Sequence, residues 1–165
     1  MKFKNLVDKT ANFLFNRLAE ATGVTLLILS VLLLMSLISY SPEDPNFIFP
    51  EDTKINNLLG AKGSYASDIL YQSIGLISLL IPISLFFVSF LVIIEKKILI
   101  ILESLFFIIL YSILGAIFFT VFHTESYWLT INGNNGFVGN LFEKNFLVNF
   151  INLNHQISYI FLIIL

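Results

Sequence analysis

The 165-residue sequence contains no cysteine, and it is poor in charge. Without thiols the chain has no disulfide framework, no thiolate metal site and no cysteine nucleophile. Charged residues make up 12% of the chain, against about 25% in ordinary soluble domains. Apolar residues make up 57%. This composition excludes the soluble globular class and favours a membrane protein.

Three uncharged runs are long enough to cross a bilayer, whose hydrocarbon core is about 30 Å thick. They cover residues 21–42, 69–94 and 104–122. At roughly 1.5 Å per helical residue, the first run measures about 33 Å and the second about 39 Å. The second run must therefore tilt, kink or start outside the hydrocarbon core, and Pro82 in its middle is a ready kink site.

A fourth apolar run, residues 156–165, ends at the last residue of the sequence. Its final nine residues would cover only about 14 Å as a helix, and a span that stopped there would leave unpaired carbonyls in lipid. We therefore expect an all-α polytopic membrane protein with four transmembrane helices, the fourth truncated at the C-terminus. On this view the sequence is an N-terminal piece of a longer protein.

The basic residues predict the orientation of these spans. Only three lie in the two longer loops, residues 43–68 and 123–155, which are Lys54, Lys62 and Lys144. The other six lie beside the spans, in the N-terminal segment and the short turn after the second run: Lys2, Lys4, Lys9, Arg17, Lys96 and Lys97. The positive-inside rule places the N-terminus and the short turn in the cytoplasm and both loops outside.

Residues 1–20 are predicted to form a basic amphipathic segment, distinct from the membrane domain of residues 21–165. Apolar residues recur there at helical spacing, with Lys and Arg on other faces. Such a helix suits the anionic cytoplasmic interface. A solvated leader into the first span is the alternative.

Motifs for catalysis or cofactor binding are not found. A nucleotide-binding loop would need a different spacing from that of the segment Gly60-Ala61-Lys62-Gly63-Ser64. A metal site would need suitably spaced ligands, which neither His123 nor His155 has. Glu103 is the one carboxylate considered as a candidate functional residue in the membrane, because intramembrane acids often mark ion paths. It also lies close to Lys96 and Lys97, where it could snorkel or pair. A small transporter or channel subunit therefore remains the alternative to a structural membrane module.

Three blocks of sequence carry a resemblance to a known family. The first run is followed by Ser39-Tyr40-Ser41-Pro42-Glu43-Asp44-Pro45. The second block comprises Asn57, Leu58, Gly60, Gly63, Tyr65, Asp68, Leu70, Gly75 and Pro82. The third is Gly136-Phe137-Val138-Gly139 with Leu141, in a loop before the fourth run. In this order and topology they resemble the N-terminal four-transmembrane-helix domain of FtsK/SpoIIIE-family DNA translocases.

This resemblance implies a non-enzymatic membrane anchor at the division septum of the bacterial inner membrane. Its implied partners are the lipid bilayer, other cell-division membrane proteins and further copies of itself. Full-length members carry a cytoplasmic hexameric ATPase that moves DNA during chromosome segregation. The anchor part is expected to bind neither DNA nor a cofactor.

The motif residues are expected to have structural roles, and none is predicted to be catalytic, cofactor-binding or metal-binding. Pro42 and Pro45 should end the first helix, and Gly60 and Gly63 should occupy turns. Asp68 should cap the N-terminus of the second span. The other family-motif positions are Asp44, Gly75, Pro82, Gly136 and Gly139.

Overall fold

The computed structural model describes residues 2–46, 54–123, 125, 126, 129, 131–143 and 160. Within these residues the structure is helical and contains no β-strand. The elements are α1 (Lys2–Ile38), α2 (Gly60–Ile74), the 3-10 helix η1 (Gly75–Leu79), α3 (Leu80–Glu95), α4 (Leu99–Phe122) and α5 (Gly136–Glu143). The fourth run predicted at residues 156–165 lies outside the described residues except for Ile160.

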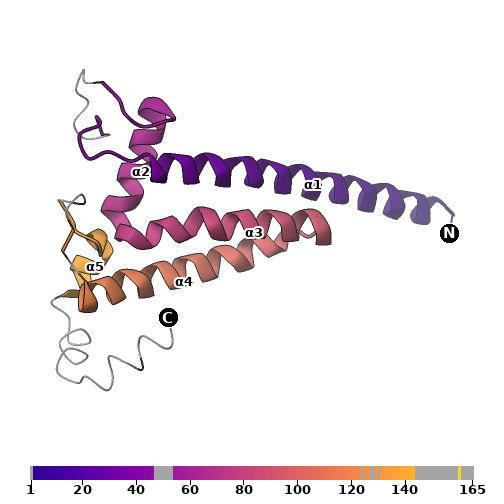
Figure 1. Cartoon of the computed structure of the whole chain (residues 1–165). Helices are drawn as coiled ribbons and strands as arrows, with labels where there is room; N and C mark the ends of the chain where they lie inside the picture. The colour runs from indigo at the N-terminus through magenta and orange to yellow at the C-terminus, as the bar shows by residue number, and fades with distance from the viewer. Residues whose placement is uncertain are drawn as a thin grey trace.

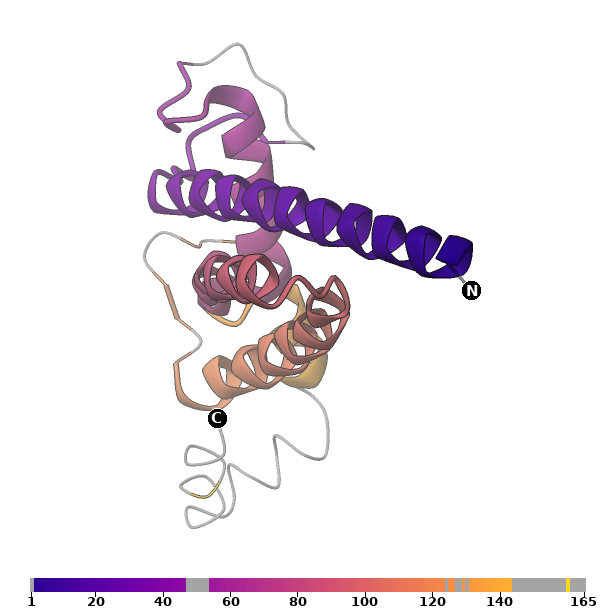
Figure 2. The same ribbon diagram turned by 90° about the vertical axis from the view of Figure 1, so that its right-hand side faces the viewer.

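Helices α1, α3 and α4 lie side by side and form the body of the structure (Figure 1). We call one end of this body the loop end, because α2, α5 and the described connecting segments gather there. The opposite end, called the N-terminal end, holds the start of α1 and the turn between α3 and α4. Figure 2 shows α1 crossing α3 obliquely and extending past it at the N-terminal end.

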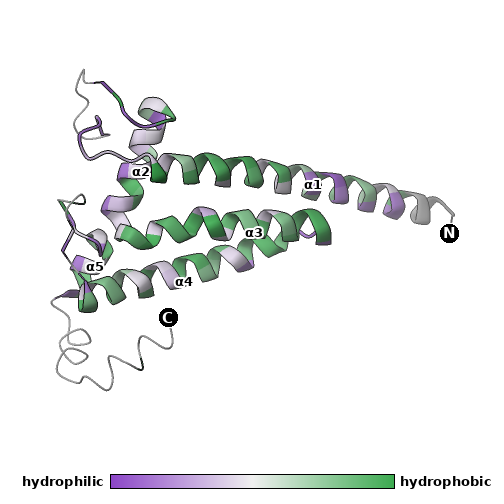
Figure 3. Ribbon diagram, viewed as in Figure 1, coloured by the Kyte–Doolittle hydropathy of each residue, from purple (hydrophilic) through white to green (hydrophobic). Residues whose placement is uncertain are grey.

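Three helical stretches are long and apolar enough to cross a membrane, at Val7–Ile38, Gly60–Glu95 and Leu99–Phe122. At most 33% of the most apolar window in each stretch is buried among the described residues. Figure 3 shows apolar residues along the three long helices and polar residues at the loop end and in the first half of α1. The prediction of an all-helical membrane protein is confirmed for the described residues, which contain three helical stretches able to cross a membrane. The fourth span stays a prediction.

The first helix differs from its predicted boundaries. Helix α1 runs without a break from Lys2 to Ile38, so the predicted segment 1–20 and the first span form one continuous helix. The helix ends before Pro42, which lacks the N–H that would bond the carbonyl of Ile38 four residues earlier. A turn follows, in which the N–H of Asp44 donates to the carbonyl of Ser41 at 3.2 Å.

The predicted second span, residues 69–94, is not a single kinked helix. Helix α2 begins at Gly60 and runs across the loop end, and the chain then turns through η1 into α3 (Figure 1). The break therefore lies at Gly75, and Pro82 sits in the first turn of α3, where a missing N–H is tolerated. Together η1 and α3 measure about 34 Å, enough to cross the hydrocarbon core.

Small residues allow α1 and α3 to pack closely. Ala19 is fully buried against Val88 and Val92. A side chain at Gly23 would place its Cβ 3.0 Å from the carbonyl oxygen of Ser89 on α3. Such contacts stabilise helix pairs in lipid, where van der Waals packing replaces the hydrophobic effect.

Candidate functional site at the loop end

The last carbonyls of α1 are bonded by side chains from the following segments. The Nδ2 group of Asn57 donates to the carbonyl of Ser36 at 2.9 Å and more weakly to that of Ser39 at 3.4 Å. The hydroxyl of Tyr71, on α2, donates to the carbonyl of Leu37 at 3.1 Å. Because the last turn of a helix leaves its carbonyls without intrahelical partners, these bonds complete the end of α1.

The buried carboxylate of Asp44 fixes the segment that carries Asn57. Its two oxygens accept the backbone N–H groups of Asn56 and Asn57, each at 2.8 Å, and the residue is only 6% exposed. A buried charge needs such strong bonds to offset its loss of hydration. Asn57 also receives the N–H of Leu59 on its Oδ1 atom at 3.1 Å. We call Asp44, Asn57, Tyr71 and the end of α1 the loop-end network.

Helix α2 is held against this network at Gly63. The hydroxyl of Ser36 donates to the carbonyl of Gly63 at 2.7 Å, and an added Cβ at Gly63 would overlap the Oδ1 atom of Asn57. Gly63 is helical, so its predicted turn role is wrong, and close approach is what a side chain there would prevent. Gly60, in contrast, has a φ of +65° at the start of α2, a conformation typical of a turn glycine.

The sequence had suggested that Asp68 caps the N-terminus of a helix, but the structure places it elsewhere. Because α2 begins at Gly60, Asp68 lies in the middle of that helix. It accepts the hydroxyl of Tyr40 at 3.3 Å and the side-chain amide of Gln72 at 3.5 Å. Burial, together with the charge of Asp68, raises the pKa of Tyr40 to about 12. Asp68 therefore connects α2 to the segment that follows α1.

The turn between α2 and η1, at Gly75, packs against the segment before α5, and this contact forms a second junction at the loop end. Gly75 has φ +70° and ψ −149°, and Gly136 has φ +63°. A Cβ at Gly75 would overlap the carbonyl of Asn134, and one at Gly136 would overlap the backbone of Ile74 and Gly75. The N–H of Leu76 donates to that same Asn134 carbonyl at 2.9 Å. Both glycines are therefore required by backbone conformation and by contact.

Asparagines extend this junction from α2 to α4. Asn132 donates to the carbonyl of Gln72 at 3.1 Å, and buried Asn135 donates to the Thr120 hydroxyl at 3.2 Å and to Asn140 at 2.8 Å. The predicted glycine-rich loop at residues 136–139 is in fact the first turn of α5. Gly139 lies where an added Cβ would crowd Ala116 and Thr120 of α4.

Ion pairs gather at the N-terminal end of the body. The ammonium of Lys96 lies 2.9 Å from a carboxylate oxygen of Glu20, which also pairs with Arg17. Lys97 pairs with Glu95 at 3.2 Å. Glu103 is exposed on α4 and pairs with no basic residue in the part of the chain that the structure describes. The lysines near Glu103 in sequence thus pair elsewhere.

The described residues of the loop end form a network of polar side chains and backbone groups. Among the described residues, no three His, Asp or Glu side chains are grouped as a metal site would require. Sequence reasoning gave no role to Ser36, Tyr71 or Asn135, which the fold brings into these junctions. These polar residues lie within or beside apolar runs, which could have marked them as candidates. Their hydrogen-bond partners are distant in sequence, so the pattern did not indicate the contacts.

Comparison with known proteins relates the chain to a family of membrane domains. Residues 16–165 match the family model described as the 4TM region of DNA translocase FtsK/SpoIIIE. A DNA translocase FtsK of Rickettsia bellii (strain RML369-C) is 42% identical over 74 residues, which cover 45% of this chain and 10% of that protein. Its counterpart in Rickettsia prowazekii (strain Madrid E) is 40% identical over 67 residues, covering 41% and 9%. No solved structure matches the chain.

Proposed function

Because the chain belongs to the family of the 4TM region of DNA translocase FtsK/SpoIIIE, we propose that it anchors an FtsK-like translocase in the membrane and targets it to the septum. The observation that carries this proposal is the family match over residues 16–165. The matched segments span only about a tenth of the curated relatives, which are named DNA translocases. DNA movement in cell division and chromosome segregation is accordingly proposed for the whole translocase and not for this membrane part.

The proposed orientation puts the N-terminal end in the cytoplasm. Six of the nine basic residues lie in the first seventeen residues or in the turn before α4, and this distribution supports that direction. A fourth crossing at residues 156–165 would then return the chain to the cytoplasm, where a motor acts on DNA. The loop end would face outward in the bacterial inner membrane.

Recruitment is assigned to protein contacts of the membrane part. The loop-end network holds α2 against the end of α1, and the contact of Gly75 with Asn134 holds the segment before α5. This arrangement supports binding of other cell-division membrane proteins from outside. Self-association is a further expectation, since a ring of motors would bring several anchors together. Nucleic-acid binding and a cofactor are not part of the proposed role.

Two measurements test the proposal in a dividing bacterium. A fluorescent fusion of the 165-residue chain should concentrate at division sites, while an unrelated anchor of four helices, expressed at the same level, should not. Alkaline phosphatase fused after Ile55 should be active, and fused after Lys97 it should be inactive. Uniform labelling of the envelope would refute septum targeting, and the opposite phosphatase pattern would refute the orientation.

Substitution of Glu103 distinguishes the proposed anchor role from the alternative of a transporter or channel subunit. Its side chain is exposed on α4 and pairs with no described residue, so an anchor does not depend on its charge. The Glu103→Gln variant should localise like the wild type. Loss of an ion or solute flux in that variant would instead support the transporter reading.

A further inference from the structure

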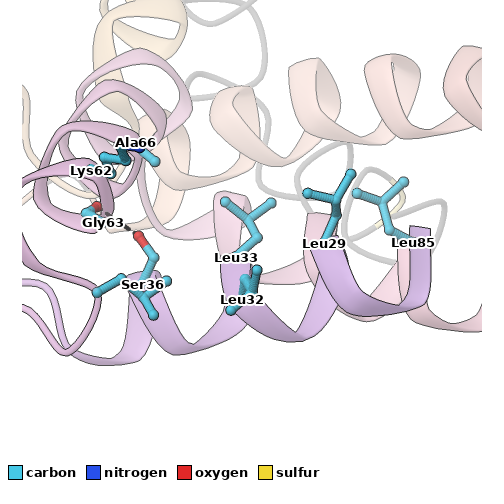
Figure 4. A pocket seen from close by; sticks show the side chains of 9 residues that line it. Leu29, Leu32, Leu33, Ser36, Lys62, Gly63, Ala66 and Leu85 are labelled. Atoms are coloured by element: carbon cyan, nitrogen blue, oxygen red, sulfur yellow. Dashed lines mark hydrogen bonds between the residues drawn. The ribbon is translucent and has the colours of Figure 1, made fainter. Parts of the chain in front are cut away.

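An open groove of about 540 Å³ lies between α1, α2 and α3, next to the loop-end network (Figure 4). Helix α1 contributes Leu29, Leu32, Leu33 and Ser36, while Leu85 comes from α3. The remaining lining residues, from α2 and the residue before it, are Leu59, Lys62, Gly63 and Ala66. The groove is open, and its lining is almost entirely apolar.

Leucines line one end of the groove, and Lys62, the one charged residue of the lining, lies at the other end. Figure 4 shows Leu29 and Leu85 at one end and Lys62, Gly63 and Ser36 at the other. The hydroxyl of Ser36 is already bonded to the carbonyl of Gly63, and Lys62 is exposed beside it. From Leu29 to Ser36 the groove follows α1 for about 10 Å, roughly a third of the hydrocarbon thickness.

The position of the groove matches the two parts of a membrane lipid. Leu29, Leu32 and Leu33 belong to the apolar half of α1, within the segment able to cross the membrane. Lys62 lies on α2, which crosses the loop end, where the chain becomes polar (Figure 3). A lysine at this level can reach the headgroup phosphates, and its attraction for them is electrostatic.

Lys62 also lacks an acidic partner. It is exposed and forms no ion pair with any residue that the structure describes, whereas Lys96 and Lys97 at the other end are paired with Glu20 and Glu95. A protein helix laid in the groove would have to bring an acid or leave a buried charge unpaired, which is costly. The apolar run at residues 156–165 contains no acid.

We propose that this groove binds an anionic glycerophospholipid, with one acyl chain along the leucines and the phosphate accepting hydrogen bonds from Lys62. Apolar contact alone would not discriminate among phospholipids that carry the same chains. The charge of Lys62 would favour a headgroup of net negative charge over a zwitterionic one. The inference depends on the membrane location of the chain and is independent of septum targeting, so either can fail alone.

Native mass spectrometry of the purified 165-residue chain tests this selectivity. The delipidated protein is given equal amounts of phosphatidylglycerol and phosphatidylethanolamine with identical acyl chains. We expect phosphatidylglycerol to be retained preferentially, and Lys62→Ala to reduce its retention about fivefold, the effect typical of one basic residue near a membrane surface. Lys54→Ala, an exposed lysine at the same end that does not line the groove, is the matched control. Equal retention of both lipids, or equal effects of the two substitutions, would overturn the proposal.

Two experiments locate the bound molecule: photolabelling by the lipid itself, and disulfide cross-linking through one introduced thiol. Because the chain has no cysteine, Leu32→Cys carries the only thiol, and its cross-linking reports whether another chain lies at the groove. A photoactivatable phosphatidylglycerol with its reactive group on the acyl chain should label α1 near residue 32 and α3 near Leu85. Efficient disulfide cross-linking between two copies through Cys introduced at Leu32 would show that a second chain occupies the groove, and would overturn the lipid assignment.

Discussion

Replacing Gly75 with alanine should break the junction between the middle of the chain and the segment before α5. The backbone angles at Gly75, φ +70° and ψ −149°, lie near a region essentially restricted to glycine, and a residue with a Cβ there costs about 1–3 kcal/mol. The new methyl group would also overlap the carbonyl of Asn134. Moving that carbonyl removes its bond from the N–H of Leu76, about 1 kcal/mol more.

We therefore expect Gly75→Ala to lower the free energy of unfolding by about 2–4 kcal/mol. Gly60→Ala is the matched control, because Gly60 also has positive φ, at +65°, but an added Cβ there meets nothing within 4 Å. Its cost should stay near 1 kcal/mol, the approximate penalty of a left-handed conformation. Both values can be measured by titrating the purified chain from mild detergent into denaturing detergent while following helicity.

Amide hydrogen exchange gives the local test of the same reasoning. The Leu76 amide should be protected in the wild type and in Gly60→Ala, and should exchange faster in Gly75→Ala. If the two alanine variants were equally stable, or if the Leu76 amide stayed protected in both, the close contact with Asn134 would not contribute as argued.

Three further perturbations address other contacts. Asn57→Ala removes the amide that donates to the carbonyls of Ser36 and Ser39, and should cost about 1–3 kcal/mol in the same unfolding titration, while Asn56→Ala, whose side chain is exposed, should be near neutral. Lys96→Glu should weaken the contact between α1 and the turn before α4, and adding Glu20→Lys should restore it, in a salt-dependent manner that a double-mutant cycle can measure; no coupling would refute the pair. Tyr40 has a pKa raised to about 12 from its usual value near 10, so its stabilising contribution is complete below about pH 10 and is lost as the pH rises towards 12. The difference in phenolate absorbance between the wild type and Tyr40→Phe should therefore have its midpoint near pH 12, and a midpoint near 10 would contradict the buried contact.

The second predicted span shows where sequence patterns are insufficient. Residues 69–94 carry no charge, so hydropathy alone gave one long run that had to tilt, kink or start outside the hydrocarbon core, with Pro82 as a ready kink site. The break lies at Gly75, since only there does the backbone adopt positive φ and accept a close neighbour from the segment before α5. That neighbour is about sixty residues away in sequence, and local propensity contains no information about it.

The roles of the polar residues also depended on contacts that the local sequence does not reveal. Asp68 was assigned to a helix N-terminus because the apolar run begins just after it, but α2 starts at Gly60 and places it in mid-helix. Asn57 belonged to a recognisable block, yet nothing in that block indicated that its amide would bond the end of α1. Hydrogen-bond partners of this kind depend on which helix ends meet.

The sequence by itself determined the membrane class, the approximate positions of three membrane-capable stretches and the family, because hydropathy, length and motif order are properties of the chain alone. The continuity of α1, the turn at Gly75, the bonds of Asn57 and the groove beside Lys62 were decided only by the tertiary structure. In lipid the apolar residues drive insertion but distinguish poorly between one packing and another. The arrangement of the helices therefore depends on close glycine contacts and on polar pairings between residues far apart in the chain.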